Sequence, residues 1–213
     1  IHAIISGAMA SGLRWGWLTS NPAAIARKPK LPTPNPKPPT PDEAARLVAG
    51  PWNEDPDFGT LVWVVTTTGI RRGEVCGLRW SRVHLDAKVL EIRRVWTGKI
   101  EKDTKTHQMR LIALDDETVK ILTGHRERWL ARVRALGMDD LPGTAFVFSY
   151  QPDACAPIHP DSLTHRYGRL ATRLGIDTHL HALRHYTATQ LLAAGFDLRT
   201  VAGRLGHGGG GAT

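Results

Sequence analysis

The sequence predicts an α+β fold that is mainly helical and carries a small antiparallel β-sheet insert. Helix-like apolar spacing precedes and follows a single group of strand-like runs at residues 89–114. The chain shows neither the strand–helix alternation of a parallel sheet nor an internal repeat. With 213 residues, of which 41% are hydrophobic, it is long enough for one ordinary core and a small appendage.

The elements expected before the strands are helices. Residues 2–18 place apolar side chains at roughly helical spacing, and the Asn-Pro pair at 21–22 breaks the pattern. Because one amphipathic helix does not fold alone, we expect it to be the last helix of a domain whose earlier part is absent. Thr40 predicts the next helix start, since a proline follows it and a glutamate lies three residues on. An apolar helix is expected over residues 61–65, ahead of Gly69.

Short strands and further helices complete the expected order. The strand-like runs cover residues 89–96, 99–100 and 110–114, with polar turns at 97–98 and 102–107. A long helix is expected at 115–134, with apolar side chains on one face at Val119, Leu122, Trp129 and Val133. The remaining apolar patterns predict helices at residues 161–174, 180–192 and 198–205.

Basic charge is concentrated at the start of the chain. The net charge is +8, and seven of the 14 prolines lie between Pro29 and Pro41, a run that forms neither a helix nor a sheet interior and should be extended polyproline. We therefore expect the end of a truncated helical domain at residues 1–28, a proline-rich basic linker at 29–41 and a main domain at 42–213. This segment is expected to link two domains, and it could also be a basic strap that passes around a DNA duplex, since the two roles are compatible. Residues 1–40 contain no acidic residue, and their basic residues, expected to contact phosphates, are Arg14, Arg27, Lys28, Lys30 and Lys37.

Composition and motifs exclude several classes of protein. No apolar run approaches the roughly 18 residues of a membrane span, and nothing resembles a signal peptide. Cys76 and Cys155 cannot build a disulfide framework and favour a reducing compartment. Neither a phosphate-binding glycine loop nor a dinucleotide fingerprint is present, whereas the basic charge favours nucleic acid as the partner. The chain begins at Ile1 and ends in a glycine-rich run, so we expect both ends to be truncated.

The first of four chemistry-bearing windows is TGIRRGEVCGLRW, which begins at Thr68. Gly69 permits a tight turn, so Arg71 should lie near the N-terminus of the following helix, where anions bind well. The charges in this window could equally form a surface ion pair. We expect Arg72 rather than Arg71 to be the partner of Glu74.

The other three windows carry a lysine and several histidines. TKTHQMRLIAL places Lys105 in a β turn ahead of the last expected strand. HALRH lies on an expected helix, where His181 and Arg184 are three residues apart and share a face, with His185 adjacent to both. LGH places His207 just past a glycine that ends a helix.

Other interpretations of these residues are possible when each is taken alone. The spacing of His181 and His185 suits a metal site, but metalloproteases need a glutamate at the position of Ala182, and Arg184 would repel a divalent cation. We therefore expect no metal. The histidines could also be structural or solvated, and Lys105 could be ordinary solvated surface.

Taken together, TGIRRGEVCGLRW, TKTHQMRLIAL, HALRH and LGH, in this order and at these separations, resemble the tyrosine recombinase (phage integrase) family. The resemblance covers residues 41–207 as catalytic domain, and the helix before the linker resembles the end of that family's core-binding domain. It implies supporting roles for His185 and Glu74 and a DNA contact for Arg72. The catalytic residues that it implies are Arg71, Lys105, His181, Arg184 and His207.

The resemblance implies a site-specific DNA recombinase (integrase) that cleaves and rejoins DNA through a 3′-phosphotyrosyl intermediate, with no cofactor. In that chemistry two guanidinium groups bind the charge that gathers on the phosphate, and a loop lysine protonates the leaving 5′ oxygen. We expect the nucleophilic tyrosine shortly after Thr213, because no tyrosine follows His207. The chain as given should then bind DNA without cutting it. Core or surface positions are expected for Tyr150, Tyr167 and Tyr186.

The resemblance also implies partners and a location. We expect double-stranded DNA as the partner, a homotetramer on paired DNA sites, a monomer when free in solution, no membrane contact, and a cytoplasmic, nucleoid-associated location. A type IB topoisomerase would share the chemistry, and strand transfer between two duplexes would distinguish a recombinase from it. A non-catalytic DNA-binding module is the alternative from another class.

Overall fold

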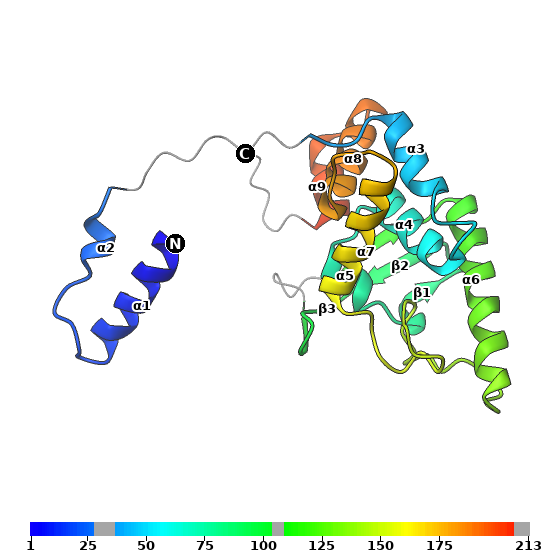
Figure 1. Ribbon diagram of the computed structural model, residues 1–213, viewed down its shortest axis with the longest axis horizontal. Coiled ribbons are helices and arrows are strands. Elements are labelled where there is room, and N and C mark those ends of the chain that lie inside the picture. The colour runs from blue at the N-terminus through cyan, green and yellow to red at the C-terminus, as the bar shows by residue number, and fades with distance from the viewer. Residues whose placement is uncertain (28–36, 104–108, 207–213) are drawn as a thin grey trace. The chain divides into compact units, whose positions relative to one another are not determined.

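The computed structural model describes residues 1–27, 37–103 and 109–206 (Figure 1). The chain divides into two compact units, Ile1–Asn35 and Pro36–Thr213. Most of the proline-rich segment lies outside the described residues, so its extended conformation stays a prediction.

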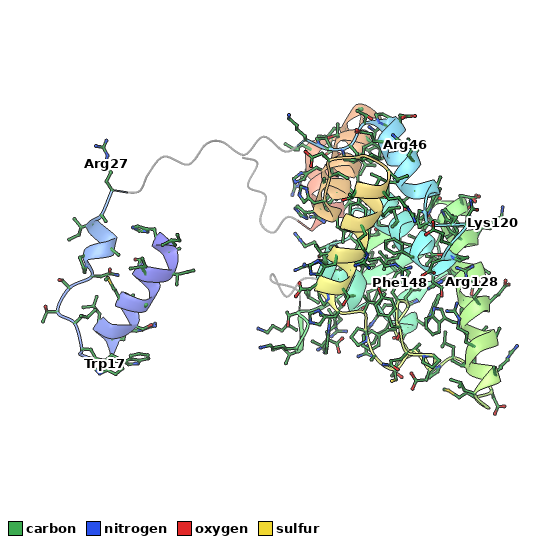
Figure 2. The ribbon with its side chains drawn as sticks, viewed as in Figure 1. Trp17, Arg27, Arg46, Lys120, Arg128 and Phe148 are labelled. Atoms are coloured by element: carbon green, nitrogen blue, oxygen red, sulfur yellow. The ribbon has the colours of Figure 1, made fainter. Side chains whose placement is uncertain are left out.

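The first unit contains α1 (His2–Arg14) and α2 (Pro22–Ile25). The helix predicted over residues 2–18 is wrong at its C-terminal end, because Gly16 adopts a positive φ of 72° that ends the helix after Arg14. The Asn21 amide donates to the Ser6 carbonyl at 3.0 Å and connects the two helices. Much of the apolar surface of this unit is exposed in its described residues, including the indole of Trp17 (Figure 2).

The second unit begins with α3 (Pro41–Ala49), whose predicted start at Thr40 is confirmed. The Thr40 hydroxyl accepts from the Glu43 N–H at 3.3 Å, and the Glu43 carboxylate accepts from the Thr40 N–H at 2.8 Å. This reciprocal cap satisfies two backbone donors with residues that lie within one turn, and such a cap is worth about 1 kcal/mol.

The long apolar helix α4 (Pro56–Thr68) lies at the centre of this unit and packs against α3, α6 and α8 (Figure 1). Most of its side chains are buried, as the apolar run at 61–65 predicts. The other long helices agree with prediction to within two residues at each end, and they are α6 (Asp116–Ala135), α7 (Pro160–Arg173), α8 (Leu180–Ala193) and α9 (Leu198–Leu205).

The sheet insert consists of two small antiparallel sheets. β1 (Val83–His84), β2 (Val89–Ile92) and β5 (Arg110–Ala113) form the first, in the order β1-β2-β5, with Leu90 opposite Ile112 in its buried layer. β3 (Arg94–Trp96) and β4 (Glu101–Asp103) form the second. Two short helices, α5 (Arg72–Cys76) and the 3₁₀ helix η1 (Trp80–Arg82), connect α4 to the first sheet.

Two strand predictions need correction. The run predicted at 89–96 is two strands in different sheets, separated at Arg93. The strand predicted at 99–100 is instead the end of a turn, because Ile100 O accepts from the Thr97 N–H at 3.2 Å and from the Thr97 hydroxyl at 3.0 Å. The strand that pairs with β3 therefore starts at Glu101, and Lys102 belongs to it and not to the predicted turn at 102–107.

The fold is mainly helical with small antiparallel sheets, as predicted. Its core joins α4, α6 and the first sheet with α7 and α8. In the described ranges no helix has the length and apolarity to cross a membrane. Both cysteines are free thiols, Cys76 buried and Cys155 exposed.

Candidate active site

Arg71 stands at the turn between α4 and α5. Gly69 ends α4 in the left-handed region (φ 64°), and Arg71 occupies the N-cap position of α5, as the first motif predicts. A side chain at Gly69 would collide with Leu205, since an added Cβ would lie 2.4 Å from Leu205 Cδ2. The glycine thus permits both the backbone conformation and the close approach of α9 to this turn.

Glu74 organises the arginines around it. Its side chain is only 1% exposed and accepts from the Arg71 N–H at 2.8 Å and from Arg71 Nη1 at 3.0 Å. Arg110, from β5, donates to both carboxylate oxygens, Nη1 to Oε1 at 2.8 Å and Nη2 to Oε2 at 2.6 Å. A carboxylate so buried is held in its charged form by these two guanidinium groups.

The ion pair predicted between Arg72 and Glu74 is wrong. Side chains two positions apart on a helix point in different directions, whereas the residues Arg71 and Glu74, three apart, share a face. Arg72 turns away toward α7, where its Nη1 lies 2.8 Å from the Thr164 hydroxyl and 3.3 Å from Asp161.

The pKa of Glu74 reflects two opposing effects. Burial by itself would raise this pKa, but the hydrogen bonds and charge of Arg110, together with those of Arg71, lower it below its ordinary value. Glu74 is therefore ionised at neutral pH.

Arg184, on α8, is the second arginine of the predicted pair, and its whole residue is only 3% exposed. Its Nη1 donates to the Gly69 carbonyl at 2.5 Å, and its Nη2 donates to the Leu205 carbonyl. Burial and the nearby charge of Arg71 lower the pKa of Arg184 to about 10. The guanidinium stays protonated at neutral pH and is held on two sides by backbone oxygens.

Three guanidinium groups meet at the C-terminal end of α9. Arg110 Nε donates to the Arg204 carbonyl at 3.1 Å, Arg184 donates to Leu205, and Arg71 Nη2 donates to the Gly206 carbonyl at 2.6 Å. These carbonyls have no partner within the helix and carry the negative end of its dipole. The structure thus brings Arg71 and Arg184 together from distant parts of the chain.

The histidine pair lies on α8, next to Arg184 in sequence. The rings of His181 and His185 are edge to face, with centroids 5.0 Å apart. Burial lowers the pKa of His181, and the neighbouring His185 and Arg184 lower it further. Burial, with the charges of His179 and Arg184, lowers the pKa of His185 too. Both imidazoles are therefore neutral at pH 7 and able to accept a proton.

The remaining predicted residues are spread over the chain. Lys105, His207, Lys28 and Lys30 lie outside the described residues. The side chains of Arg14, Arg27 and Lys37 are exposed (Figure 2 labels Arg27). Among the described residues no group of three or more His, Cys, Asp or Glu side chains could hold a metal ion.

The tyrosines fit the core and surface positions predicted for them. Tyr167 is fully buried on α7, and burial raises its pKa above the ordinary value, which makes it a poor nucleophile. Tyr150 is exposed in the loop before α7, beside a cavity of about 310 Å³ that is also lined by Asp55, Asp57 and His125. Tyr186 is half-buried on α8.

Arg110 is absent from the residues predicted for the site. Its strand gives one signal: Arg110 alternates with the exposed Leu111 and shares the inner side of β5 with the buried Ile112. An arginine that points inward needs a buried carboxylate, and Glu74 is that partner. The match between them depends on tertiary structure and is not visible in the local sequence.

Known proteins resemble this chain in sequence and in fold. Residues 40–213 match the phage integrase family. The chain is 30% identical over 201 residues to tyrosine recombinase XerC of Xanthomonas axonopodis pv. citri (strain 306), an alignment that covers 92% of this chain and 58% of that protein. The chain thus spans less than two thirds of the length of that relative.

Two solved structures share the fold. The crystal structure of XerA recombinase is similar with a TM-score of 0.64 and 28% identity, over 84% of this chain and 58% of that one. A lambda integrase tetramer bound to a Holliday junction is similar with a TM-score of 0.68 and 18% identity, over 98% of this chain and 57% of that one. The motifs, the fold and the match over residues 40–213 lead to one conclusion: the chain belongs to the phage integrase family.

Proposed function

We propose that this chain is the catalytic part of a site-specific DNA recombinase that cleaves and rejoins DNA through a 3′-phosphotyrosyl intermediate. The observation that carries the proposal is the meeting of Arg71 and Arg184 at one point, where they donate to the consecutive carbonyls of Gly206 and Leu205. Membership of the phage integrase family supports the same function.

The chemistry of phosphodiester cleavage explains the residue types. Attack on phosphorus gathers negative charge on the non-bridging oxygens, which Arg71 and Arg184 stabilise with guanidinium groups that stay charged. Lys105 protonates the leaving 5′ oxygen, and the neutral His181 helps to remove the proton of the nucleophile. His207 donates a hydrogen bond to a phosphate oxygen. The covalent phosphotyrosyl bond conserves the energy for religation, so the reaction needs neither ATP nor a metal ion.

The nucleophile in this proposal is a tyrosine outside the 213 residues, in the segment that follows Thr213. Burial raises the pKa of Tyr167 and makes it a poor nucleophile, and Tyr150 lines a cavity whose lining includes none of Arg71, Arg110 and Arg184. The chain as given therefore binds duplex DNA and leaves it uncut.

The proposed substrate is double-stranded DNA. Four copies of the protein bind paired DNA sites as a homotetramer, and the protein is a monomer when it is free in solution. A structure with this fold is a tetramer on a Holliday junction, which supports the assembly. The net charge of +8 and the exposed basic side chains support DNA as the partner. The location proposed for this activity is the bacterial cytoplasm, at the nucleoid. The contacting residues proposed are Arg14, Arg27, Lys28, Lys30, Lys37 and Arg72.

A covalent adduct tests the function. The 213-residue chain and a chain extended through the first tyrosine after Thr213 are each incubated with a nicked duplex that carries a recombination site, and are then run on a denaturing gel. Only the extended chain should give a denaturant-resistant protein–DNA band, and replacing its added tyrosine by phenylalanine should abolish it. With two sites present it should exchange strands. Relaxation of supercoils without exchange would indicate a topoisomerase, and no adduct from any extended chain would indicate a binding module.

A further inference from the structure

Arg110 joins three parts of the candidate site through one guanidinium group. The residue lies at the start of β5, and its side chain is only 11% exposed. Its Nη1 and Nη2 bind the two oxygens of Glu74 on α5, and its Nε binds the Arg204 carbonyl at the end of α9. No other arginine in the described part of the chain makes this set of contacts.

The carboxylate of Glu74 has two donors on each oxygen. Oε1 accepts from Arg71 Nη1 at 3.0 Å and Arg110 Nη1 at 2.8 Å, and Oε2 accepts from the Arg71 N–H at 2.8 Å and Arg110 Nη2 at 2.6 Å. Because the rigid fork of Arg110 takes both oxygens, the carboxylate cannot rotate. Its two contacts with Arg71 are fixed as a result.

The end of α9 lies directly against the Arg110 side chain. Gly206 has a positive φ of 67°, and a Cβ added there would lie 2.7 Å from Arg110 Nη1. The glycine that precedes His207 in the LGH motif is thus the residue that lets the chain pass over Arg110.

We propose that Arg110 is a positioning residue of this site, which orients Arg71 through Glu74 and holds the end of α9 against the two catalytic arginines. The effect of Arg110 on catalysis rests on the proposed function. Its contacts with Glu74 and Arg204 do not depend on that function.

The proposal predicts a change in pH dependence that a purely structural role does not. The charged groups that face Glu74 are Arg71 beside it on the same turn, Arg110 from β5 and Arg184 from α8. Without Arg110, the effect of burial dominates and the pKa of Glu74 rises. Glu74 then takes up a proton as the pH falls, and Arg71 loses its ionic partner.

The test uses the chain extended through the first tyrosine after Thr213, with Arg110→Gln and Arg110→Lys. Arg128→Gln is the matched control, because Arg128 on α6 (Figure 2) also binds a carboxylate, that of Asp57 at 2.9 Å, away from the site. Cleavage of the nicked duplex is measured from pH 5 to pH 8 and divided by the folded fraction. Arg110→Gln should cleave about 10²-fold more slowly at pH 7, and the deficit should grow as the pH falls. Arg110→Lys should recover part of the rate, and Arg128→Gln should follow the parent profile.

A second measurement separates this proposal from the proposed function. In the 213-residue chain, carbon NMR of the Glu74 carboxyl group should show a higher pKa in the Arg110 variants than in the parent or in Arg128→Gln. If the parent forms no adduct, the proposed function is wrong and this titration alone decides about Arg110. An unchanged Glu74 pKa, or a parental rate and pH profile per folded molecule, would overturn the proposal. Should Arg110→Gln fail to fold, Arg110→Lys carries both measurements.

Discussion

The guanidinium group of Arg184 donates a hydrogen bond to the carbonyl oxygen of Gly69, two residues before Arg71. The backbone turn that presents one arginine of the candidate site is therefore fixed by the other. The position of Arg71 at the N-cap of α5 thus depends on Arg184, which lies on α8.

Gly69→Ala tests how tightly α9 packs against this turn. Alanine is strained at a φ of 64°, and its Cβ would also displace Leu205, so we expect a loss of about 2–4 kcal/mol in the free energy of unfolding. Gly175→Ala is the matched control, because Gly175 has a φ of 68° but nothing lies within 4 Å of an added Cβ. It should lose only about 1 kcal/mol. Urea unfolding of both variants measures the difference, and equal losses would show that the contact with α9 contributes nothing.

Arg184→Lys should impair chemistry more than DNA binding. An ammonium group cannot donate to the Gly69 and Leu205 carbonyls and also make a two-point contact with phosphate, so cleavage by the extended chain should fall by roughly 10²-fold or more. Affinity for the duplex should change little, because the other basic residues proposed to contact DNA phosphates remain. Arg173→Lys, which alters an exposed pair with Glu54, is the control and should cleave at the parental rate. A parental rate for Arg184→Lys would remove Arg184 from the phosphate-binding pair.

Asp57 should make the free energy of unfolding decrease as the pH falls. Burial would raise its pKa, but the buried His125 and the guanidinium groups of Arg128 and Arg132 lower it well below the ordinary range. A carboxyl group with a lowered folded pKa adds stability above its unfolded pKa of about 3.9, and this stability is lost as the pH falls.

Asp57→Asn should therefore flatten the free energy of unfolding between about pH 5 and pH 2, where the parent loses on the order of 2 kcal/mol. Asp116→Asn is the control, since its partner Lys88 is a surface residue and the pair is screened by solvent. Chemical denaturation at a series of pH values gives both curves. A slope in Asp57→Asn as steep as in the parent would place the acid sensitivity elsewhere.

The basic residues of the first 40 positions should add affinity that does not depend on DNA sequence. Replacing all five with glutamine keeps Thr40 and its cap, and should lower the slope of log affinity against log salt by about 0.9 for each lost phosphate contact. Lys120→Gln, which removes one exposed charge from α6, is the control for a general charge effect (Figure 2). Titrations of a labelled duplex at several salt concentrations measure the slope, and an unchanged slope would leave the segment as a passive spacer.

Local signals account for the parts of the fold that could be predicted. The cap at Thr40 and the cap at Asp115 involve only residues within one helical turn, so the starts of α3 and α6 are visible in the sequence. The turn at Gly69 is likewise visible in the local sequence. The sequence predicts the start of β4 two residues too early, because the hydrogen bond by which Thr97 and Ile100 close a turn is not visible in the local sequence.

Long-range pairing accounts for what could not be predicted. Arg72 and Arg71 are chemically equivalent neighbours of Glu74, and only the helical geometry decides which of them binds it. The pair between Arg110 and Glu74 joins a strand to a helix across 36 positions, so no local pattern indicates it. The family motifs point to Arg71 and Arg184, whereas Arg110, which binds Glu74 beside Arg71, becomes visible only in three dimensions.

The cap at the start of α3 has a consequence for how such proteins diversify. Both hydrogen bonds of the cap lie between Thr40 and Glu43, so the cap itself uses no residue before Thr40. A gene fusion that exchanges the segment before Thr40 would leave this helix start unchanged. The position before Thr40 is therefore suited to module exchange, in which the second unit keeps its first helix start beside a different N-terminal segment.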